Sequence, residues 1–191
     1  MPLTGLSRTP IPPRPAGRLA PARLARALGV TRVARVTGLD RAGVEVACAV
    51  RPAGHVLQVT NGKGLRWADA AAGALLEAAE LACAEAIAPA SLVWASAGDL
   101  DACGAEHLAP ADLGGRAAPG LRLAWRAGED LFTSRPVLVP AAAVHATPRG
   151  GPVLGLAELR WTSNGMGAHP SRGAALVHAL LEAAERHALA R

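Results

Sequence analysis

Four glutamates form two identical pairs, and the two members of each pair have the spacing of neighbours on one helix face. Glu77 and Glu80 lie in the string LLEAAE, and the same six letters return 105 residues later around Glu182 and Glu185. Residues three apart on an α-helix differ by about 60° around its axis, so the carboxylates of a pair share a face. Two like charges on an apolar helix cost free energy unless a cation lies beside them. The duplicated pair is therefore the first candidate for chemistry.

Paired carboxylates on two facing helices have the chemistry of a site for a hard divalent cation. Mg2+ prefers oxygen ligands and commonly completes its shell with water and nucleotide phosphates. Each pair follows an Asn-Gly, and Asn61 and Asn164 are the only asparagines in the chain. Glycine-rich loops before a helix can offer backbone amides to phosphate, and Lys63, the single lysine, could add a positive charge to the same anion. The repeat predicts a magnesium–nucleotide site between two similar halves.

A simpler interpretation treats both pairs as solvated faces of amphipathic helices. Glutamate is a strong helix former, and helices of Ala, Leu and Glu are common. In the second copy Arg186 can reach Glu182 at i+4, whereas no basic residue lies three or four positions from Glu77 or Glu80. The simpler interpretation is favoured for either pair alone, and the duplication favours the metal site. His178 shares the face of Glu182 and is a candidate hydrogen-bond donor behind the metal ligands.

The composition predicts a globular cytoplasmic protein. The 191 residues are 51% apolar, which suffices for one domain or two small ones with a real core. No apolar run reaches the roughly 18 residues of a membrane helix. The net charge of +5 invites a nucleic-acid partner, but the arginines are spaced singly, aromatic residues are 3%, and no such binding motif is present. Three cysteines without a CxxC pair favour a reducing compartment.

The hydrophobic pattern predicts an α+β fold in which mixed sheets pack on two long alanine-rich helices. Residues 1–17 are proline-rich and are expected to be extended, with the folded domain at 18–191. Helices are predicted at 21–28, at 69–87 and from an N-cap at Ser171 to the C-terminus. Strands are predicted at 44–50, 55–60, 135–140 and 151–162, with a loop at Asn61–Gly64 and no element assigned to 95–128. Strand, Asn-Gly loop and helix are thus expected to occur twice.

Several strings along the chain, taken in order, resemble landmarks of the YcaO-domain family. They include "TNGKGL", "ALLEAAE", "DLFTSRPVLVP", "TSNGMG" and "HALLEAAER", and the resemblance runs from about residue 9 to the last residue. It implies an ATP- and Mg2+-dependent fold whose members phosphorylate the oxygen of a peptide amide. A phosphorylated oxygen leaves readily, so a Cys, Ser or Thr side chain can close an azoline ring, or an external sulfur or amine can give a thioamide or amidine. Metal ions would stabilise the charge of the transferring phosphoryl group.

The resemblance also implies roles for individual residues and a precursor peptide as partner, as in modified-peptide natural product biosynthesis. It matches the family's first metal-binding pair to Glu77 and Glu80, and the second to Glu182 and Glu185. The residues expected at the nucleotide are Lys63 in the GKG turn, Asn164 in the second loop and Arg186 after the second pair. A role for Lys63 in shaping the loop or the substrate channel remains an alternative.

The chain departs from the family pattern at positions that bear on activity. Gly73 stands where a serine is usual, Leu81 where an arginine is usual, and Pro170 and Ala174 where a later Asn and Glu help to bind nucleotide and metal. Family members continue for a comparable length after the second helix, so we expect a partial domain without its C-terminal half.

Two functional interpretations therefore stay open. Completed by a homodimer partner or by a separate chain, the protein would be an ATP-dependent cyclodehydratase-like enzyme. Left incomplete, it would be a non-catalytic YcaO remnant that binds a precursor peptide or a partner protein. An arginine-rich nucleic-acid binder is a third class, which the spacing of the arginines disfavours.

Overall fold

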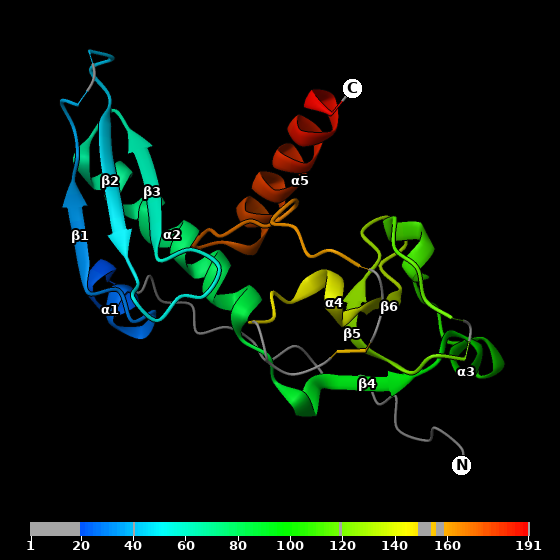
Figure 1. The fold of residues 1–191 in the computed structure, drawn as a ribbon. Helices are drawn as coiled ribbons and strands as arrows, with labels where there is room; N and C mark the ends of the chain where they lie inside the picture. Colours follow the sequence, from blue (N-terminus) through cyan, green and yellow to red (C-terminus); the bar gives the residue numbers. More distant parts are fainter. Residues whose placement is uncertain (1–19, 40, 119, 149–153, 156–158, 191) are drawn as a thin grey trace.

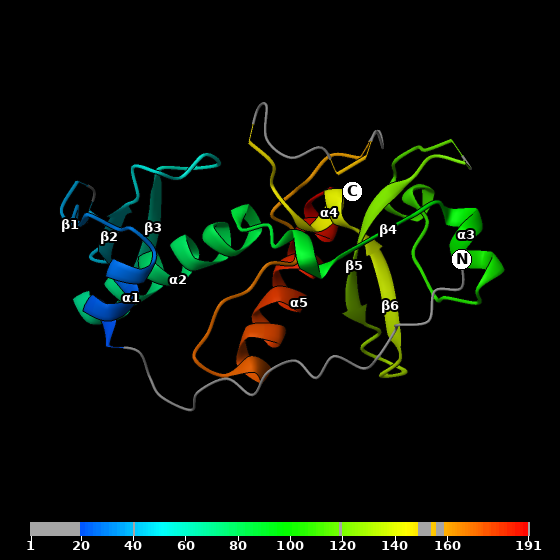
Figure 2. The ribbon, with the colours of Figure 1, turned by 90° about the horizontal axis from the view of Figure 1, so that it is seen from below.

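Two small sheets joined by one long helix make up the fold. The computed structural model describes residues 20–39, 41–118, 120–148, 154–155 and 159–190. Each sheet has three antiparallel strands, in the order β1-β2-β3 and β4-β5-β6. Helix α2 (Trp67–Glu85) runs from beneath the first sheet toward the second (Figure 1), and the view from below places the sheets at opposite ends of it (Figure 2). The predicted α+β class is confirmed, while the proline-rich segment 1–17 lies outside the described residues.

The first sheet packs on α2 through unusually small side chains. Its strands are β1 (Arg32–Arg35), β2 (Glu45–Val50) and β3 (Val59–Gly64), and α1 (Pro21–Ala27) precedes them. Alternation along β2 turns Ala47 and Ala49 toward the helix, where both are fully buried against Ala70, Ala74 and Leu75. The predicted helix at 21–28 and the predicted strand at 44–50 are confirmed. A core of alanines lets the helix axis lie close to the sheet.

The predicted loop at Asn61–Gly64 is wrong, because these residues are the last four of β3. The predicted strand at 55–60 is accordingly displaced to Val59–Gly64. Gly62 faces α2, and a Cβ at this position would lie within 3.0 Å of the Ala70 oxygen and the Ala74 nitrogen. The glycine is therefore needed for a close approach of strand and helix, and it does not form a phosphate-binding loop before the helix.

The second sheet lies in the part of the chain where hydrophobic periodicity is weak. Its strands are β4 (Leu92–Ala95), β5 (Leu123–Glu129) and β6 (Pro136–Pro140), accompanied by α3 (Ala97–Ala102), α4 (Ala141–Val144) and two short 3-10 turns, η1 (Pro89–Ser91) and η2 (Pro110–Leu113). Trp125 is fully buried at its centre and donates a hydrogen bond from Nε1 to the Ala95 oxygen, 3.0 Å away. The strand predicted at 135–140 is confirmed, whereas β4 and β5 were not predicted.

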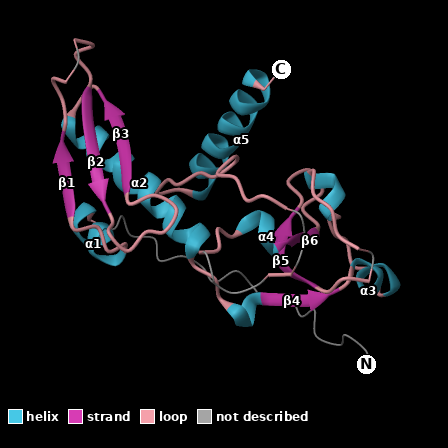
Figure 3. Ribbon diagram, in the orientation of Figure 1, coloured by secondary structure: helices cyan, strands magenta, loops and turns pink. Residues whose placement is uncertain are grey.

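The final helix, α5 (Arg172–Leu189), begins where the sequence places it. The Ser171 hydroxyl accepts a hydrogen bond from the Ala174 nitrogen at 3.3 Å, which confirms the predicted N-cap. The predicted strand–loop–helix repeat is not found in the described residues, because Asn164 lies in a turn with Gly165 at φ 75° and no strand precedes it. Of the predicted strand at 151–162, the described residues are not in a strand (Figure 3). None of the described helices is both long and apolar enough to cross a bilayer.

Candidate functional site

The two carboxylates of α2 are each fixed by a backbone N–H from a different segment. Glu77 Oε2 accepts from the Asn61 nitrogen at 2.8 Å, at the open edge of β3. Glu80 Oε1 accepts from the Ala168 nitrogen at 2.7 Å, in the segment between Asn164 and α5. Glu77 is thus bonded to the first Asn-Gly itself, and Glu80 to a residue shortly after the second. Each carboxylate keeps a second oxygen for another ligand.

The segment that holds Glu80 also brings α5 beside it. A Cβ at Gly167 would lie within 3.0 Å of the Ala175 oxygen and 3.0 Å from Ala179, so this segment packs directly on the first turns of α5. Burial raises the pKa of the half-buried Glu80 carboxyl; the Ala168 hydrogen bond and the charge of His178 oppose this rise, while Glu182 and Glu77 add to it. The structure therefore brings Glu182 and His178 of α5 within electrostatic range of Glu80.

The remaining predicted site residues lie further toward solvent. Arg186 Nη2 is 3.5 Å from Glu182 Oε1, as the i+4 spacing predicts, and Glu185 is exposed on the same helix. Asn164 is exposed in its turn. Because Gly62 faces α2, alternation along β3 turns the exposed Lys63 to the opposite face of the sheet. The structure thus groups Lys63 with the solvent face and not with the glutamates.

The donor chemistry of this cluster fits Mg2+, but the donors are not gathered into a finished site. Glu77, Glu80 and Glu182 supply the carboxylate oxygens that Mg2+ prefers. In the described part of the chain, however, no group of three His, Cys, Asp or Glu side chains is close enough to hold a metal ion. The charges of Glu77 and Glu182 both act on Glu80, but the three carboxylates do not form a metal-binding group as they lie.

Glu80→Gln is expected to stabilise the metal-free protein at pH 7. Glutamine keeps an acceptor for the Ala168 N–H and removes a charge that burial disfavours. Since the pKa of Glu80 is raised in the folded state, the folded chain binds more protons than the unfolded chain, and the cost of the charge grows as pH rises. We expect a gain below about 1 kcal/mol at pH 7 that disappears below about pH 4, measured by urea unfolding. A variant less stable than wild type at pH 7 would contradict this account.

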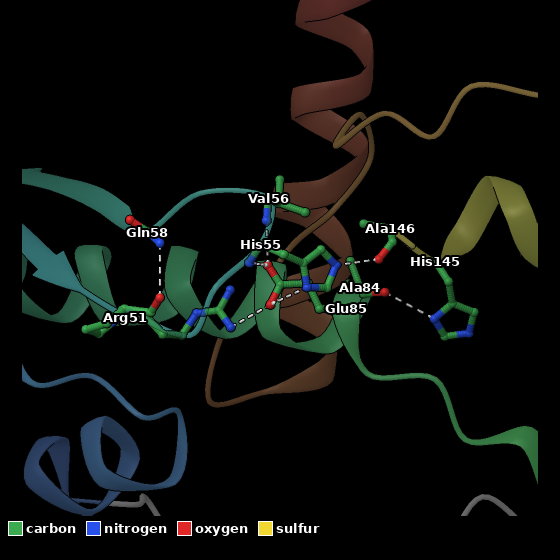
Figure 4. A network of polar contacts seen from close by, with 9 residues as sticks. Arg51, His55, Val56, Gln58, Ala84, Glu85, His145 and Ala146 are labelled. Atoms are coloured by element: carbon green, nitrogen blue, oxygen red, sulfur yellow. Dashed lines mark hydrogen bonds and ion pairs between the residues drawn. The ribbon is translucent and has the colours of Figure 1, made fainter. Parts of the chain in front are cut away.

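A second polar cluster, which the sequence analysis did not single out, lies at the C-terminal end of α2 (Figure 4). Glu85 Oε2 accepts from Arg51 Nη1 at 2.6 Å, and the side chains of this pair are only 7% and 8% exposed. Glu85 Oε1 accepts from the backbone nitrogens of His55 and Val56, at 3.2 Å and 3.0 Å. Burial opposes ionisation of Glu85, but the hydrogen bonds of Arg51 and Val56 and the Arg51 charge outweigh it, so its pKa is lowered.

This polar cluster joins the two sheets. His55 Nε2 lies 2.8 Å from the Ala146 oxygen, and since a carbonyl only accepts, Nε2 carries the proton. The Ala84 oxygen, in the last turn of α2, accepts from the Ala146 nitrogen at 3.0 Å and faces His145 Nδ1 at 3.2 Å. A half-open pocket of about 470 Å³ lies beside this junction, lined by His55, Val56, Ala146, Thr147, Pro148 and Trp161.

Residues 61–191 match the family described as YcaO cyclodehydratase, ATP- and Mg2+-binding. The match includes α2, α5 and both glutamate pairs, and it covers more than half of the chain. The chain belongs to the YcaO family.

Curated relatives from bacteria and archaea share most of this chain. An uncharacterized protein in the tfuA 3′ region of Rhizobium leguminosarum bv. trifolii is 34% identical in an alignment 173 residues long that covers 86% of this chain and 39% of the relative. An uncharacterized protein of Methanothermobacter thermautotrophicus is 33% identical in an alignment 163 residues long that covers 84% of this chain and 42% of the relative. The chain spans about two fifths of the length of these relatives.

Solved structures confirm the predicted YcaO-like fold. The structure of YcaO from Methanopyrus kandleri bound with AMPPCP and Mg2+ has a TM-score of 0.63 and 28% identity to this chain, over 84% of this chain and 38% of that one. A heterocyclase in complex with substrate and cofactor has a TM-score of 0.63 and 16% identity, over 86% and 27%. At 16% identity, the similarity to the heterocyclase shows a shared fold and nothing more.

Proposed function

We propose that this chain forms the Mg-ATP-binding side of a YcaO domain that activates peptide amides. The observation that carries the proposal is the approach of Glu182 on α5 to Glu80 on α2, held by the Ala168 hydrogen bond. Membership of an ATP- and Mg2+-binding family supports it, as does the M. kandleri relative bound with AMPPCP and Mg2+.

The chain's own residues suit the binding of a metal–nucleotide complex. Glu77, Glu80 and Glu182 would hold Mg2+, which would neutralise phosphate charge when bound. Arg186 lies one turn beyond Glu182, so a small rotation of its side chain can exchange the Glu182 carboxylate for a phosphate. The exposed face of β3 favours a role for Lys63 in contact with the peptide substrate over contact with the nucleotide.

The proposed reaction is ATP-dependent activation of a peptide backbone amide in a cytoplasmic precursor peptide. Transfer of the γ-phosphoryl group of ATP to the amide oxygen forms one P–O bond, while the P–O bond to the β-phosphate breaks and ADP leaves. The later attack of a nucleophile on the amide carbon expels phosphate. Azoline, thioamide and amidine products all follow from this intermediate, according to the nucleophile. The described residues do not favour one of the three.

A non-catalytic binding module is the second candidate, and one specific observation favours it. The acidic cluster is not assembled into a metal site among the described residues. Gly73, Leu81, Pro170 and Ala174 also differ from the residues that the family resemblance leads one to expect. Such a module would bind a precursor peptide or a partner protein without turning over ATP.

Calorimetric titration with Mg-AMPPCP separates the two candidates. We expect binding at millimolar or tighter affinity, equivalent to at least about 4 kcal/mol, that requires Mg2+ and is lost in Glu80→Gln. The matched control is Glu106→Gln, which removes one exposed carboxylate from the other sheet region and should bind as wild type. Absence of heat with the folded wild-type chain would overturn the nucleotide site and leave the binding module.

A further inference from the structure

The pocket beside the junction of the two sheets has fixed walls on the side of α2. His55, Val56 and Ala146 form these walls. The backbone nitrogens of His55 and Val56 both donate to Glu85, at 3.2 Å and 3.0 Å. The Ala146 nitrogen donates to the Ala84 oxygen at 3.0 Å. All three residues are thus held on the last turn of α2 (Figure 4). A wall that is fixed before a ligand arrives does not have to be ordered on binding.

Most side chains that line this pocket are apolar or aromatic, and they are Val56, Ala146, Pro148 and Trp161. The volume of about 470 Å³ lies within the range of about 300–1,000 Å³ that is usual for small-ligand sites. A pocket of this size has room for one large side chain and the backbone beside it. An apolar ligand that fills it gains free energy from the surface that it removes from water.

The polar groups of the pocket leave few hydrogen bonds for a ligand. His55 Nε2 lies 2.8 Å from the Ala146 oxygen and Nδ1 lies 3.7 Å from Glu85 Oε2, so both nitrogens of the ring already face a protein oxygen. The Thr147 hydroxyl has no hydrogen-bond partner among the described residues, so it can pair with one polar group of a ligand. A nucleotide base would bury more donors and acceptors than these side chains can pair, which costs free energy. A hydrocarbon side chain has no such groups.

The pocket is close to the acidic cluster along α2. Glu80 and Glu85 are five residues apart, which is about 7.5 Å along a helix axis. Trp161 comes from the segment that continues to Ala168, whose nitrogen donates to Glu80 at 2.7 Å. An extended peptide covers about 7 Å in two residues. A peptide with one amide at the acidic cluster can therefore place a neighbouring side chain in the pocket.

We propose that this pocket receives a large apolar side chain of the peptide substrate, about two residues from the amide that is activated. Phenylalanine, tryptophan and leucine have side chains of this class. The pocket would then select which amide of the peptide reaches the acidic cluster. That the ligand is a substrate rests on the proposed function, whereas the binding of an apolar side chain does not.

The test is titration of the full 191-residue chain with N-acetyl-phenylalaninamide, with neither Mg2+ nor nucleotide present. We expect saturable binding at millimolar affinity that shifts the indole N–H resonance of Trp161 in NMR spectra, assigned with Trp161→Phe. N-acetyl-alaninamide should bind at least about 10-fold more weakly, because it lacks the ring that the pocket buries. Since Mg-AMPPCP is absent, failure of this binding and failure of the nucleotide site are distinguishable.

Val56→Phe fills the pocket and should abolish binding of N-acetyl-phenylalaninamide. The matched control is Leu57→Phe, a similar enlargement at the next residue, which is 51% exposed and does not line the pocket. It should bind as wild type. Thr147→Phe repeats the test at an exposed lining position, where the substitution disturbs no buried side chain. Thr147→Phe should abolish binding and leave the circular dichroism of the chain unchanged.

The proposal is overturned if the folded wild-type chain shows no saturable binding, if the alanine compound binds as tightly as the phenylalanine compound, or if Thr147→Phe binds as well as Leu57→Phe. It is also overturned if adenosine displaces the phenylalanine compound, because the pocket would then hold a nucleotide base. Self-association that masks the Trp161 shift until Phe132→Ser abolishes it is a further contrary result. The occupant would then be the 99% exposed Phe132 of a second copy.

Discussion

Glu85→Ala is expected to destabilise the protein by about 3–5 kcal/mol, because it leaves a buried guanidinium without its counter-charge. The Arg51 side chain is 8% exposed, and its Nε and Nη2 atoms are buried without a hydrogen-bond partner among the described residues. The Glu85 carboxylate therefore compensates the Arg51 charge and also satisfies the nitrogens of His55 and Val56. Urea unfolding at pH 7 measures the loss.

The matched control for this prediction is Glu106→Ala, which removes an exposed partner of Arg135 and should cost less than about 1 kcal/mol. The pH dependence gives a second measurement. Since the pKa of Glu85 is lowered in the folded state, its contribution is complete above the unfolded value of about 4.3 and is lost as pH falls through the folded value. Equal costs for the two alanine variants at pH 7 would show that the Arg51–Glu85 pair does not hold the sheets together.

The elements with local signals were predictable from the sequence. Helices α2 and α5 contain no proline and carry alanine and leucine through their length, and Ser171 caps the second. Strand β2 alternates strictly between the sheet's two faces. Strands β4 and β5 are different, because their register depends on Trp125 and on residues distant in the chain, so local periodicity could not reveal them.

Only the part of the candidate site that depends on the spacing of residues along one helix was predictable from the sequence. The pairing of Glu77 with Glu80 follows from three residues of separation, but the partners of these side chains come from β3 and from the segment before α5. Nothing local points to Ala168 as a donor. Glu85 was missed for the same reason, since only tertiary structure brings it to Arg51, 34 residues away. The one sequence signal was an acid in the last turn of a helix, where the macrodipole disfavours it.

Gly62→Ala is expected to destabilise the protein by about 3 kcal/mol or more, through a steric clash between two backbones. The added methyl group would lie within 3.0 Å of the Ala70 oxygen and the Ala74 nitrogen, and neither atom can move without separating α2 from β3. Thr60 holds the same contact by donating its hydroxyl hydrogen to the Ala74 oxygen at 2.8 Å. Glu77 of α2 accepts a hydrogen bond from the backbone nitrogen of Asn61, the residue before Gly62 in β3. The clash should therefore weaken Mg-AMPPCP binding as well.

Gly73→Ala is the matched control, on the other side of the same contact. A Cβ at Gly73 would lie 3.4 Å from the Gly62 Cα, which is ordinary van der Waals contact, and alanine favours the helix by about 1 kcal/mol. Gly73→Ala should therefore stay within about 1 kcal/mol of wild type in urea unfolding. If Gly62→Ala were tolerated equally well, the strand and the helix would not be as close as their alanine core implies. The glycines of Asn61–Gly64 would then fit the predicted phosphate-binding loop better than a packed strand. A large loss confined to Gly62→Ala instead makes this glycine a packing residue.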